Sequence, residues 1–217
     1  MSQLTFKFPF KTNYFEEDFY VSENNFEAYK LIESWPQWSS RFINIFGPSG
    51  CGKTHLANIF NHKINSFLIK ASDLNNDVLS SIKIKECLIV DEYKNNIEEK
   101  LFYSVLSQSY LSNQYVIVNS LEAIQSFEIK LKDLKSRFGS FINISIDLPT
   151  DELIKVIISK SFSDKQVKIE NKLLEYIIKN IDRSYEAIFD LIDKLDDFSL
   201  SSGKSININL IKKALNK

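Results

Sequence analysis

A glycine-rich octapeptide limits more than any other feature how this chain of 217 residues can fold. It matches the pattern G-x-x-x-x-G-K-[ST] in full and reads Gly47-Pro48-Ser49-Gly50-Cys51-Gly52-Lys53-Thr54. The segment 41–47 has the apolar composition of a buried strand, and helical spacing begins at Gly52. A strand, a glycine-rich turn and a helix in this order predict a loop whose backbone N–H groups point at phosphate oxygens.

Polar side chains in and near this loop fit nucleotide chemistry. We expect Lys53 to reach the β- and γ-phosphates and Thr54 to hold Mg²⁺. The apolar run 86–92 ends in Asp91 and Glu92. At the carboxyl edge of a neighbouring strand, Asp91 would bind Mg²⁺ through water and Glu92 would orient the attacking water. The alternative is a strand that ends in two solvated carboxylates.

Strand and helix patterns alternate along the first two thirds of the chain. The strand patterns occupy 41–47, 66–71, 86–92, 114–120 and 140–148. The helical patterns between them occupy 22–34, 52–62, 97–112 and 128–137, and Ser22 is the expected N-cap of the first. This alternation predicts an α/β fold with a five-stranded parallel sheet flanked by helices. After Pro149 only helical patterns follow, which predicts a small helical lid subdomain; they occupy 150–162, 170–181, 184–198 and 207–216.

The composition argues against several other classes of protein. Hydrophobic residues make up 44% and charged residues 25%, as in globular domains, and a net charge of −1 gives no global attraction to nucleic acid or a membrane. No apolar run approaches the ~20 residues of a membrane span, and the N-terminus lacks the apolar stretch of a signal peptide. Cys51 and Cys87 are far apart, so neither a zinc site nor a disulfide framework is indicated. We expect a cytoplasmic protein.

Arginine is scarce in this chain. Lys and Arg together number 27, and only three of them are Arg: Arg41, Arg137 and Arg183. A codon bias explains such an excess of Lys. Because guanidinium is a planar donor fork and ammonium a compact point charge, a remaining Arg can mark a position where Lys cannot do the task.

Three segments together resemble the DnaA branch of the AAA+ ATPases. The phosphate loop continues into His55-Leu56-Ala57, residues 18–25 read DFYVSENN, and residues 131–139 read LKDLKSRFG. The resemblance covers nearly the whole chain and implies that the loop and His55 bind ATP or ADP with Mg²⁺. It also implies that the upstream segment, including Tyr20, Val21 and Asn25, contacts the adenine.

The resemblance gives Arg137 the position of an arginine finger, which reaches a nucleotide held by a neighbouring subunit. Such a finger is typically worth ~10³–10⁵ in rate. The alternative is a solvated Arg on a basic helix.

Two further polar positions keep alternatives open. Arg183 lies near the family's sensor-2 Arg, but a gapless alignment puts that position on Glu186, so an ion-paired Arg at a helix start is equally expected. Asn119 or Ser120, at the end of a strand, would be the sensor-1 group beside the γ-phosphate, and the alternative is a turn residue. We interpret Arg41 as structural.

The layout of the chain is similar to that of the Hda type, the regulatory inactivators of DnaA. It predicts a clamp-binding peptide at 1–12, the AAA+ core at 13–149 and the lid at 150–217, with no domain for direct sequence-specific DNA binding. Residues 3–8 resemble a peptide that docks on the DNA polymerase sliding clamp, with anchors at Gln3, Leu4, Phe6 and Phe8. The alternative is a tail whose Phe side chains pack on the core.

The leading hypothesis is a nucleotide-bound regulator that docks on the sliding clamp and stimulates hydrolysis of DnaA-bound ATP, which represses replication initiation. Because the phosphate-loop motifs are intact, the alternative is a self-sufficient AAA+ ATPase such as a helicase loader. A third possibility is a binding module that keeps ADP as a structural ligand. A homodimer and a head-to-tail oligomer both remain open.

Overall fold

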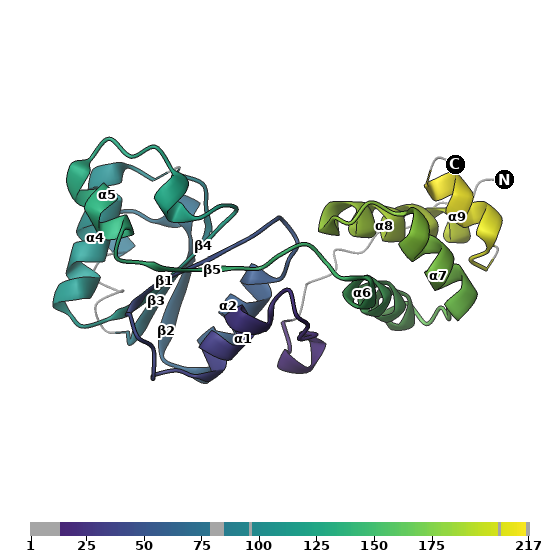
Figure 1. Ribbon diagram of the computed structural model, residues 1–217, viewed down its shortest axis with the longest axis horizontal. Helices are drawn as coiled ribbons and strands as arrows, with labels where there is room; N and C mark the ends of the chain where they lie inside the picture. The colour runs from purple at the N-terminus through teal and green to yellow at the C-terminus, as the bar shows by residue number, and fades with distance from the viewer. Residues whose placement is uncertain (1–13, 79–84, 96, 204, 216–217) are drawn as a thin grey trace. The chain divides into compact units, whose positions relative to one another are not determined.

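The computed structural model describes residues 14–78, 85–95, 97–203 and 205–215. These residues form two units, each described by itself: an α/β unit, Tyr14–Asp147, and a helical unit that begins at Leu148 (Figure 1). No helix in the described ranges is long and apolar enough to cross a membrane.

A five-stranded parallel sheet forms the centre of the α/β unit, which confirms the expected fold class. Its strands are β1 (Phe42–Phe46), β2 (Ser66–Lys70), β3 (Cys87–Tyr93), β4 (Tyr115–Ser120) and β5 (Ile142–Ser145). The spatial order β2-β3-β4-β1-β5 places β1 between β4 and β5. The carboxyl ends of β3, β4 and β1 therefore lie side by side, and the phosphate loop follows β1 directly.

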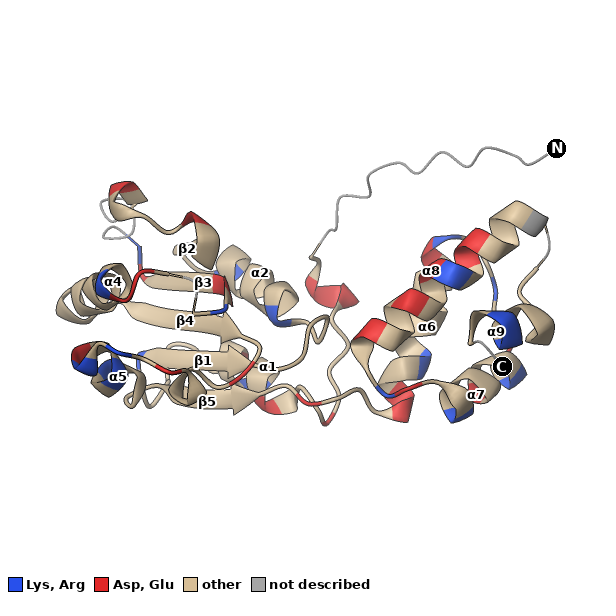
Figure 2. Ribbon diagram, turned by 90° about the horizontal axis from the view of Figure 1, so that it is seen from above, with Lys and Arg blue, Asp and Glu red and all other residues tan. Residues whose placement is uncertain are grey.

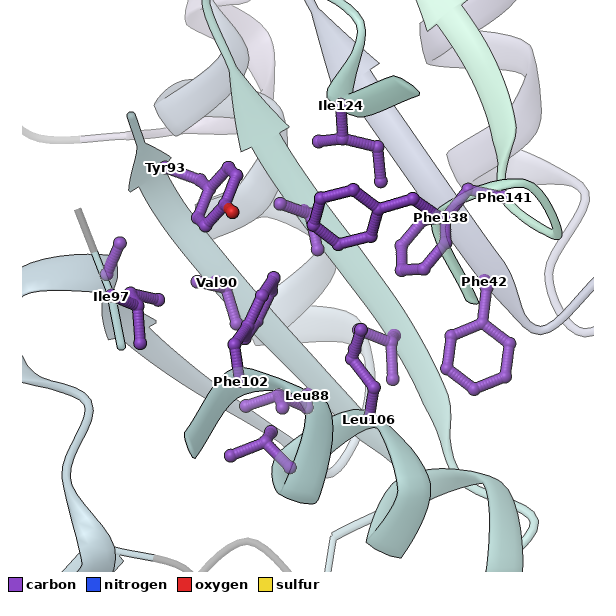
Figure 3. Close-up of a cluster of buried hydrophobic side chains, with 14 of the residues drawn as sticks. Phe42, Leu88, Val90, Tyr93, Ile97, Phe102, Leu106, Ile124, Phe138 and Phe141 are labelled. Atoms are coloured by element: carbon purple, nitrogen blue, oxygen red, sulfur yellow. The ribbon is translucent and has the colours of Figure 1, made fainter. Parts of the chain in front are cut away.

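Helices cover both faces of this sheet (Figure 1). One face carries α1 (Phe26–Glu33) and α2 (Lys53–Lys63), and the other carries α4 (Glu99–Leu111) and α5 (Lys132–Phe138). Aromatic rings fill the space beneath α4 and α5: Tyr93 stacks on Phe102 at 4.9 Å between centroids, and Phe138 meets both edge to face (Figure 3). These rings are 2% exposed or less, so α4 and α5 are fixed to the sheet by a close-packed core.

The helix α5 is shorter than the sequence pattern predicts, because residues 128–131 are not helical. The Glu99 carboxylate accepts hydrogen bonds from the backbone N–H groups of Lys130 (3.0 Å) and Leu131 (2.6 Å), immediately before α5 begins. These two bonds lower the pKa of Glu99. At the other end of α5 the Gln125 amide donates to the carbonyl oxygen of Phe138 at 3.2 Å. Side chains from outside the helix therefore hold both of its ends.

Two other boundaries differ from the prediction. The helix α1 begins at Phe26 with Asn25 as its N-cap residue, because the Asn25 side chain accepts a hydrogen bond from the backbone N–H of Ser22 (2.9 Å) and keeps 22–25 in a turn. The last strand is confined to Ile142–Ser145, and shortly after it the backbone N–H of Asp147 donates to the carbonyl oxygen of Asn24, which belongs to no strand.

The helical unit contains α6 (Asp151–Asp164), α7 (Asn171–Asn180), α8 (Tyr185–Ser202) and α9 (Ile208–Ala214), as the sequence pattern predicts. Three of them begin with a side-chain cap: Thr150 accepts from the N–H of Leu153, Ser184 from that of Ala187, and Asn207 from that of Leu210. The helices share a core of their own, built from aliphatic residues and Phe162, so the unit is held together independently of the sheet.

We expect the backbone amide signals of Lys130 and Leu131 to titrate with the Glu99 carboxylate. Because folding lowers the pKa of Glu99, its contribution to stability is fully present above its unfolded pKa, near 4.3, and is lost as pH falls through the lower folded value. ¹⁵N–¹H NMR against pH would show both amides moving together with a midpoint below about 4.3. Glu99→Gln should abolish the titration and Glu98→Gln, on the adjacent exposed position, should leave it intact. Amides that do not move would contradict the assignment.

Candidate functional site

The phosphate loop adopts a backbone that requires its glycines. Gly50 and Gly52 have left-handed φ angles of 81° and 101°. A Cβ atom at Gly47 would lie 2.3 Å from the carbonyl oxygen of Ile146, and one at Gly52 would lie 3.0 Å from the ring of Phe19. The loop is therefore a cradle that only residues without a side chain can form at these positions.

Lys53 folds back over this cradle from the first turn of α2. Its Nζ donates to the carbonyl oxygens of Gly47 (2.7 Å) and Pro48 (2.9 Å), and it lies 3.5 Å from Cys51 Sγ. Burial raises the pKa of the Cys51 thiol, so this residue is a neutral packing group of the loop. The ammonium is thus held where the phosphates of a nucleotide would meet it.

A buried carboxylate joins the loop to the sheet. Asp91, at 4% exposure near the end of β3, accepts from Thr54 Oγ1 at 2.7 Å and from Asn119 Nδ2 at 2.9 Å. Asn119 is fully buried at the end of β4 and also donates to the carbonyl oxygen of Lys53 at 3.2 Å. The neighbouring Ser120 contacts the loop only through its backbone, since its carbonyl oxygen accepts from the N–H of Gly47 and its hydroxyl donates to the carbonyl oxygen of Glu122; of the two candidate side chains, that of Asn119 lies with the loop.

These residues fit a nucleotide with its magnesium ion. The Asn119 Oδ1 atom is buried and has no hydrogen-bond partner among the described residues, which is a polar group left for a ligand or water. Thr54 and Asp91 could supply two oxygen ligands, and no cluster of three or more His, Cys, Asp or Glu side chains in the described ranges could hold a metal alone. Mg²⁺ usually takes one or two protein oxygens together with substrate phosphates and water, which this pair would provide.

Glu92 is held by a side chain from outside the phosphate loop and its hydrogen-bonded partners. It has a left-handed φ of 58°, uncommon for a residue with a side chain, at a register shift between β3 and β4. Its carboxylate accepts from Lys70 Nζ at 2.7 Å across the β2–β3 edge, and this bond raises the pKa of Lys70. Both side chains are about half exposed, so the pair is accessible to solvent.

Aromatic residues and His55 fix the segment before α1 against the loop helix. His55 Nε2 lies 2.7 Å from the carbonyl oxygen of Phe15, and its ring meets the edges of Tyr14 and Phe19. Further along, Asn25 Nδ2 donates to the carbonyl oxygen of Tyr20 at 2.9 Å, so the Asn25 amide is used to shape the turn. Tyr20 is exposed and Val21 partly buried, beside this turn.

The three arginines have three different environments. Arg41 donates to the side-chain oxygen of Asn113, which fits a structural role. Arg183 forms an ion pair with Asp151 (2.9 Å) within the helical unit. Arg137 lies on α5, whose Lys and Arg positions are blue in Figure 2. Its Cζ atom lies 4.6 Å from the centroid of the Tyr110 ring, and no acceptor for its guanidinium is found among the described residues. Of the three arginines, Arg137 alone has no hydrogen-bond acceptor for its guanidinium in the described part of the chain.

Comparison with known proteins finds two matching family models and relatives among replication initiators. A family model described as "Hda, lid domain" matches residues 151–215, and one described as "RNA helicase" matches residues 43–126. The chromosomal replication initiator protein DnaA of Borrelia garinii is 24% identical over 97% of this chain, which spans 49% of that protein. The chain thus spans about half the length of the initiators it matches.

Solved structures show the same fold. Domain III of DnaA from Thermotoga maritima superposes with a TM-score of 0.76 at 19% identity, covering 96% of this chain and 98% of that one. AMPPCP-bound DnaA from Aquifex aeolicus gives a TM-score of 0.68 at 22% identity, covering 86% of this chain and 66% of that one. The chain is a DnaA-related AAA+ protein with an Hda-type lid.

This DnaA-related protein brings together most of the residues that its sequence marks as a nucleotide site. The loop, Lys53, Thr54, Asp91 and Asn119 form one hydrogen-bonded group. Arg137 lies outside that group, on the face covered by α4 and α5. The expected clamp anchors Gln3, Leu4, Phe6 and Phe8 lie outside the described residues.

Sequence reasoning missed three side chains that act on this AAA+ site or on α5: Lys70, Glu99 and Tyr110. None belongs to a motif, and Lys70 is one of many lysines. Its contact with Glu92 follows from the position of β2 beside β3, because the parallel register pairs Lys70 with Asp91 and so brings Lys70 next to Glu92. The sequence alone does not contain that strand order.

We expect Lys70→Ala to raise the ATP turnover of this DnaA-related chain. Without the ammonium, the Glu92 carboxylate is free to orient water, and the gain should be about fivefold or less, because an exposed ion pair is worth about 1 kcal/mol or less. A phosphate-release assay with purified chain and Mg²⁺-ATP measures it. Lys70→Arg, which keeps the pair, should behave as wild type, and the gain should vanish in Lys70→Ala/Glu92→Gln. A gain that persists in the double variant would show that Glu92 is not its source.

Proposed function

We propose that this protein is a nucleotide-bound regulator that docks on the DNA polymerase sliding clamp and stimulates hydrolysis of the ATP held by DnaA. The observation that carries the proposal is the contrast between Arg137 and Glu92. The guanidinium of Arg137 has no acceptor among the described residues, whereas the carboxylate of Glu92 is paired with Lys70. A chain built this way is better suited to act on a partner's nucleotide than on its own.

The resident ligand in this proposal is ATP or ADP with Mg²⁺. The glycine cradle, Lys53 and the Thr54–Asp91 pair would hold the phosphates and the ion, whose charge neutralises the phosphate oxygens. The Aquifex aeolicus DnaA structure, which contains AMPPCP, supports an adenine nucleotide. Its role here would be structural: a ligand at 100 times its dissociation constant stabilises a folded protein by about 2.7 kcal/mol.

Arg137 would act in trans on the ATP of DnaA. Its planar fork can donate to two phosphoryl oxygens at once, and its charge would stabilise the negative charge of the transferring group. Lysine offers neither the fork nor its fixed geometry, which accounts for an Arg at this position in a chain with 24 Lys residues.

A self-sufficient ATPase is the second candidate, and one observation favours it. Thr54, Asp91 and Asn119 are already hydrogen-bonded to one another, so the elements for hydrolysis in cis are assembled except for a free Glu92. High turnover by the wild-type chain alone would favour this candidate over regulation of DnaA.

We expect Arg137→Ala to abolish stimulation of DnaA-bound ATP hydrolysis. Purified chain, DnaA carrying radiolabelled ATP and clamp loaded on DNA are mixed, and the ADP formed is measured. The loss should amount to much of the roughly 10³–10⁵-fold that a finger in trans supplies, and Arg137→Lys should recover little of it. Arg41→Ala, which removes an arginine bonded to Asn113, is the matched control and should retain stimulation. Wild-type chain that leaves DnaA-bound ATP intact would refute the proposal.

Clamp docking is tested apart from catalysis. We expect a Gln3→Ala/Leu4→Ala variant to lose retention on immobilised clamp, because it lacks an apolar anchor and the side chain that orients the peptide. Its nucleotide-induced rise in melting temperature should equal that of the wild type. A variant that stays on the clamp would remove residues 3–8 from the proposal and leave the role of Arg137 standing.

A further inference from the structure

Arg137 rests on an aromatic ring that belongs to a different helix. Its Cζ atom lies 4.6 Å from the centroid of Tyr110, near the end of α4. We propose that Tyr110 is a positioning residue, whose ring holds the Arg137 guanidinium ready for the phosphate of a partner's nucleotide. This inference rests on the proposed function of Arg137 in trans.

The backbone of the finger helix is already fixed by other groups. Glu99 binds the N–H groups just before α5, Gln125 binds the carbonyl oxygen of Phe138 at its end, and Leu134 and Phe138 are buried. What these contacts leave free is the long side chain of Arg137, which loses much rotamer entropy when it is held in one place. The ring of Tyr110 is the contact that restricts it.

Tyr110 is itself a firm platform although it is 54% exposed. Its ring stacks on that of Phe42 in β1, with centroids 6.4 Å apart and planes 24° from parallel. Phe42 is buried and packs on Phe141 at 5.2 Å, as part of the core beneath α4 and α5 (Figure 3). The buried Phe42 thus restricts the ring of Tyr110, and that ring in turn restricts the guanidinium of Arg137.

A ring suits this task better than a carboxylate does. In the Arg183–Asp151 pair, both carboxylate oxygens contact Nη2 of the guanidinium and offset its charge. The face of Tyr110 attracts the charge of Arg137 without serving as a hydrogen-bond acceptor of the oxygen type, so the in-plane N–H groups remain for a phosphate. The Tyr110 hydroxyl makes no hydrogen bond among the described residues, so the ring alone is the functional part.

The contact is tested by NMR of the full chain with labelled arginine. Three arginines give three side-chain Nε–Hε signals, and Arg137→Lys identifies that of Arg137 by its disappearance. The ring current should displace this signal in the wild type and in Tyr110→Phe, and the displacement should be lost in Tyr110→Leu. The signals of Arg41 and Arg183 serve as internal controls. An Arg137 signal that is the same in Tyr110→Leu and wild type would overturn the inference.

The functional arm uses the DnaA-bound ATP assay with loaded clamp. Tyr110→Leu should lower the maximal stimulated rate roughly two- to fivefold, which corresponds to the free energy of an exposed cation–π contact, with the half-saturating concentration of DnaA little changed. Tyr110→Phe should retain the rate. Leu111→Ala, on the adjacent exposed position, is the matched control for a change of surface and should also retain it.

The outcomes separate this inference from the proposed function. If wild-type chain fails to stimulate DnaA, the function and the positioning role are both wrong. If wild type stimulates, Arg137→Ala does not, and Tyr110→Leu equals wild type, the positioning role alone is wrong. Equal melting temperatures of Tyr110→Leu and Leu111→Ala would show that a lower rate of the former does not come from unfolding.

Discussion

The carboxylate of Asp91 is the group on which the phosphate-loop edge of the sheet depends. A buried charge is costly unless hydrogen bonds compensate it, and here Thr54 and Asn119 donate to its two oxygens. Because the three residues come from β3, α2 and β4, one carboxylate ties three elements together. The parallel order of the strands makes this possible, since it brings their carboxyl ends to one edge. In the function that we propose, the same oxygens would also bind the magnesium ion of a nucleotide, so stability and binding would depend on one group.

Local sequence patterns predict well what local forces determine. The five strands follow from short apolar runs, and the loop follows from glycines at positions where a Cβ atom would collide or a left-handed φ is needed. The ends of elements are less predictable, because distant side chains decide them. Glu99 captures the N–H groups of Lys130 and Leu131 and so delays the start of α5, and no pattern within 128–137 contains that information.

The contacts of Glu92 and Arg137 could not be predicted either, because they too join residues that are distant in the sequence. Lys70 meets Glu92 only because β2 lies beside β3, and Tyr110 meets Arg137 only because α4 and α5 pack on the same face. All four side chains are at least partly exposed, so neither burial nor hydrophobic periodicity marks them. The scarcity of arginine did narrow the search to three residues, but the structure was needed to separate them: Arg41 and Arg183 have acceptors for their donors, and Arg137 has a ring.

This separation bears on the direction in which the protein acts. The Glu92 carboxylate would have to leave Lys70 before it could act on a nucleotide bound to the same chain. An exposed ion pair of this kind is worth about 1 kcal/mol or less. The restraint on Glu92 is therefore weak and reversible. The guanidinium of Arg137 meets no such restraint, because a cation–π contact leaves its donors unused. A partner that presents a phosphate to α5 would find the finger available, whereas the chain's own site would first have to release Glu92. Because that ion pair is weak, it would still permit hydrolysis in cis, and the unused donors of Arg137 would favour the action in trans that we propose.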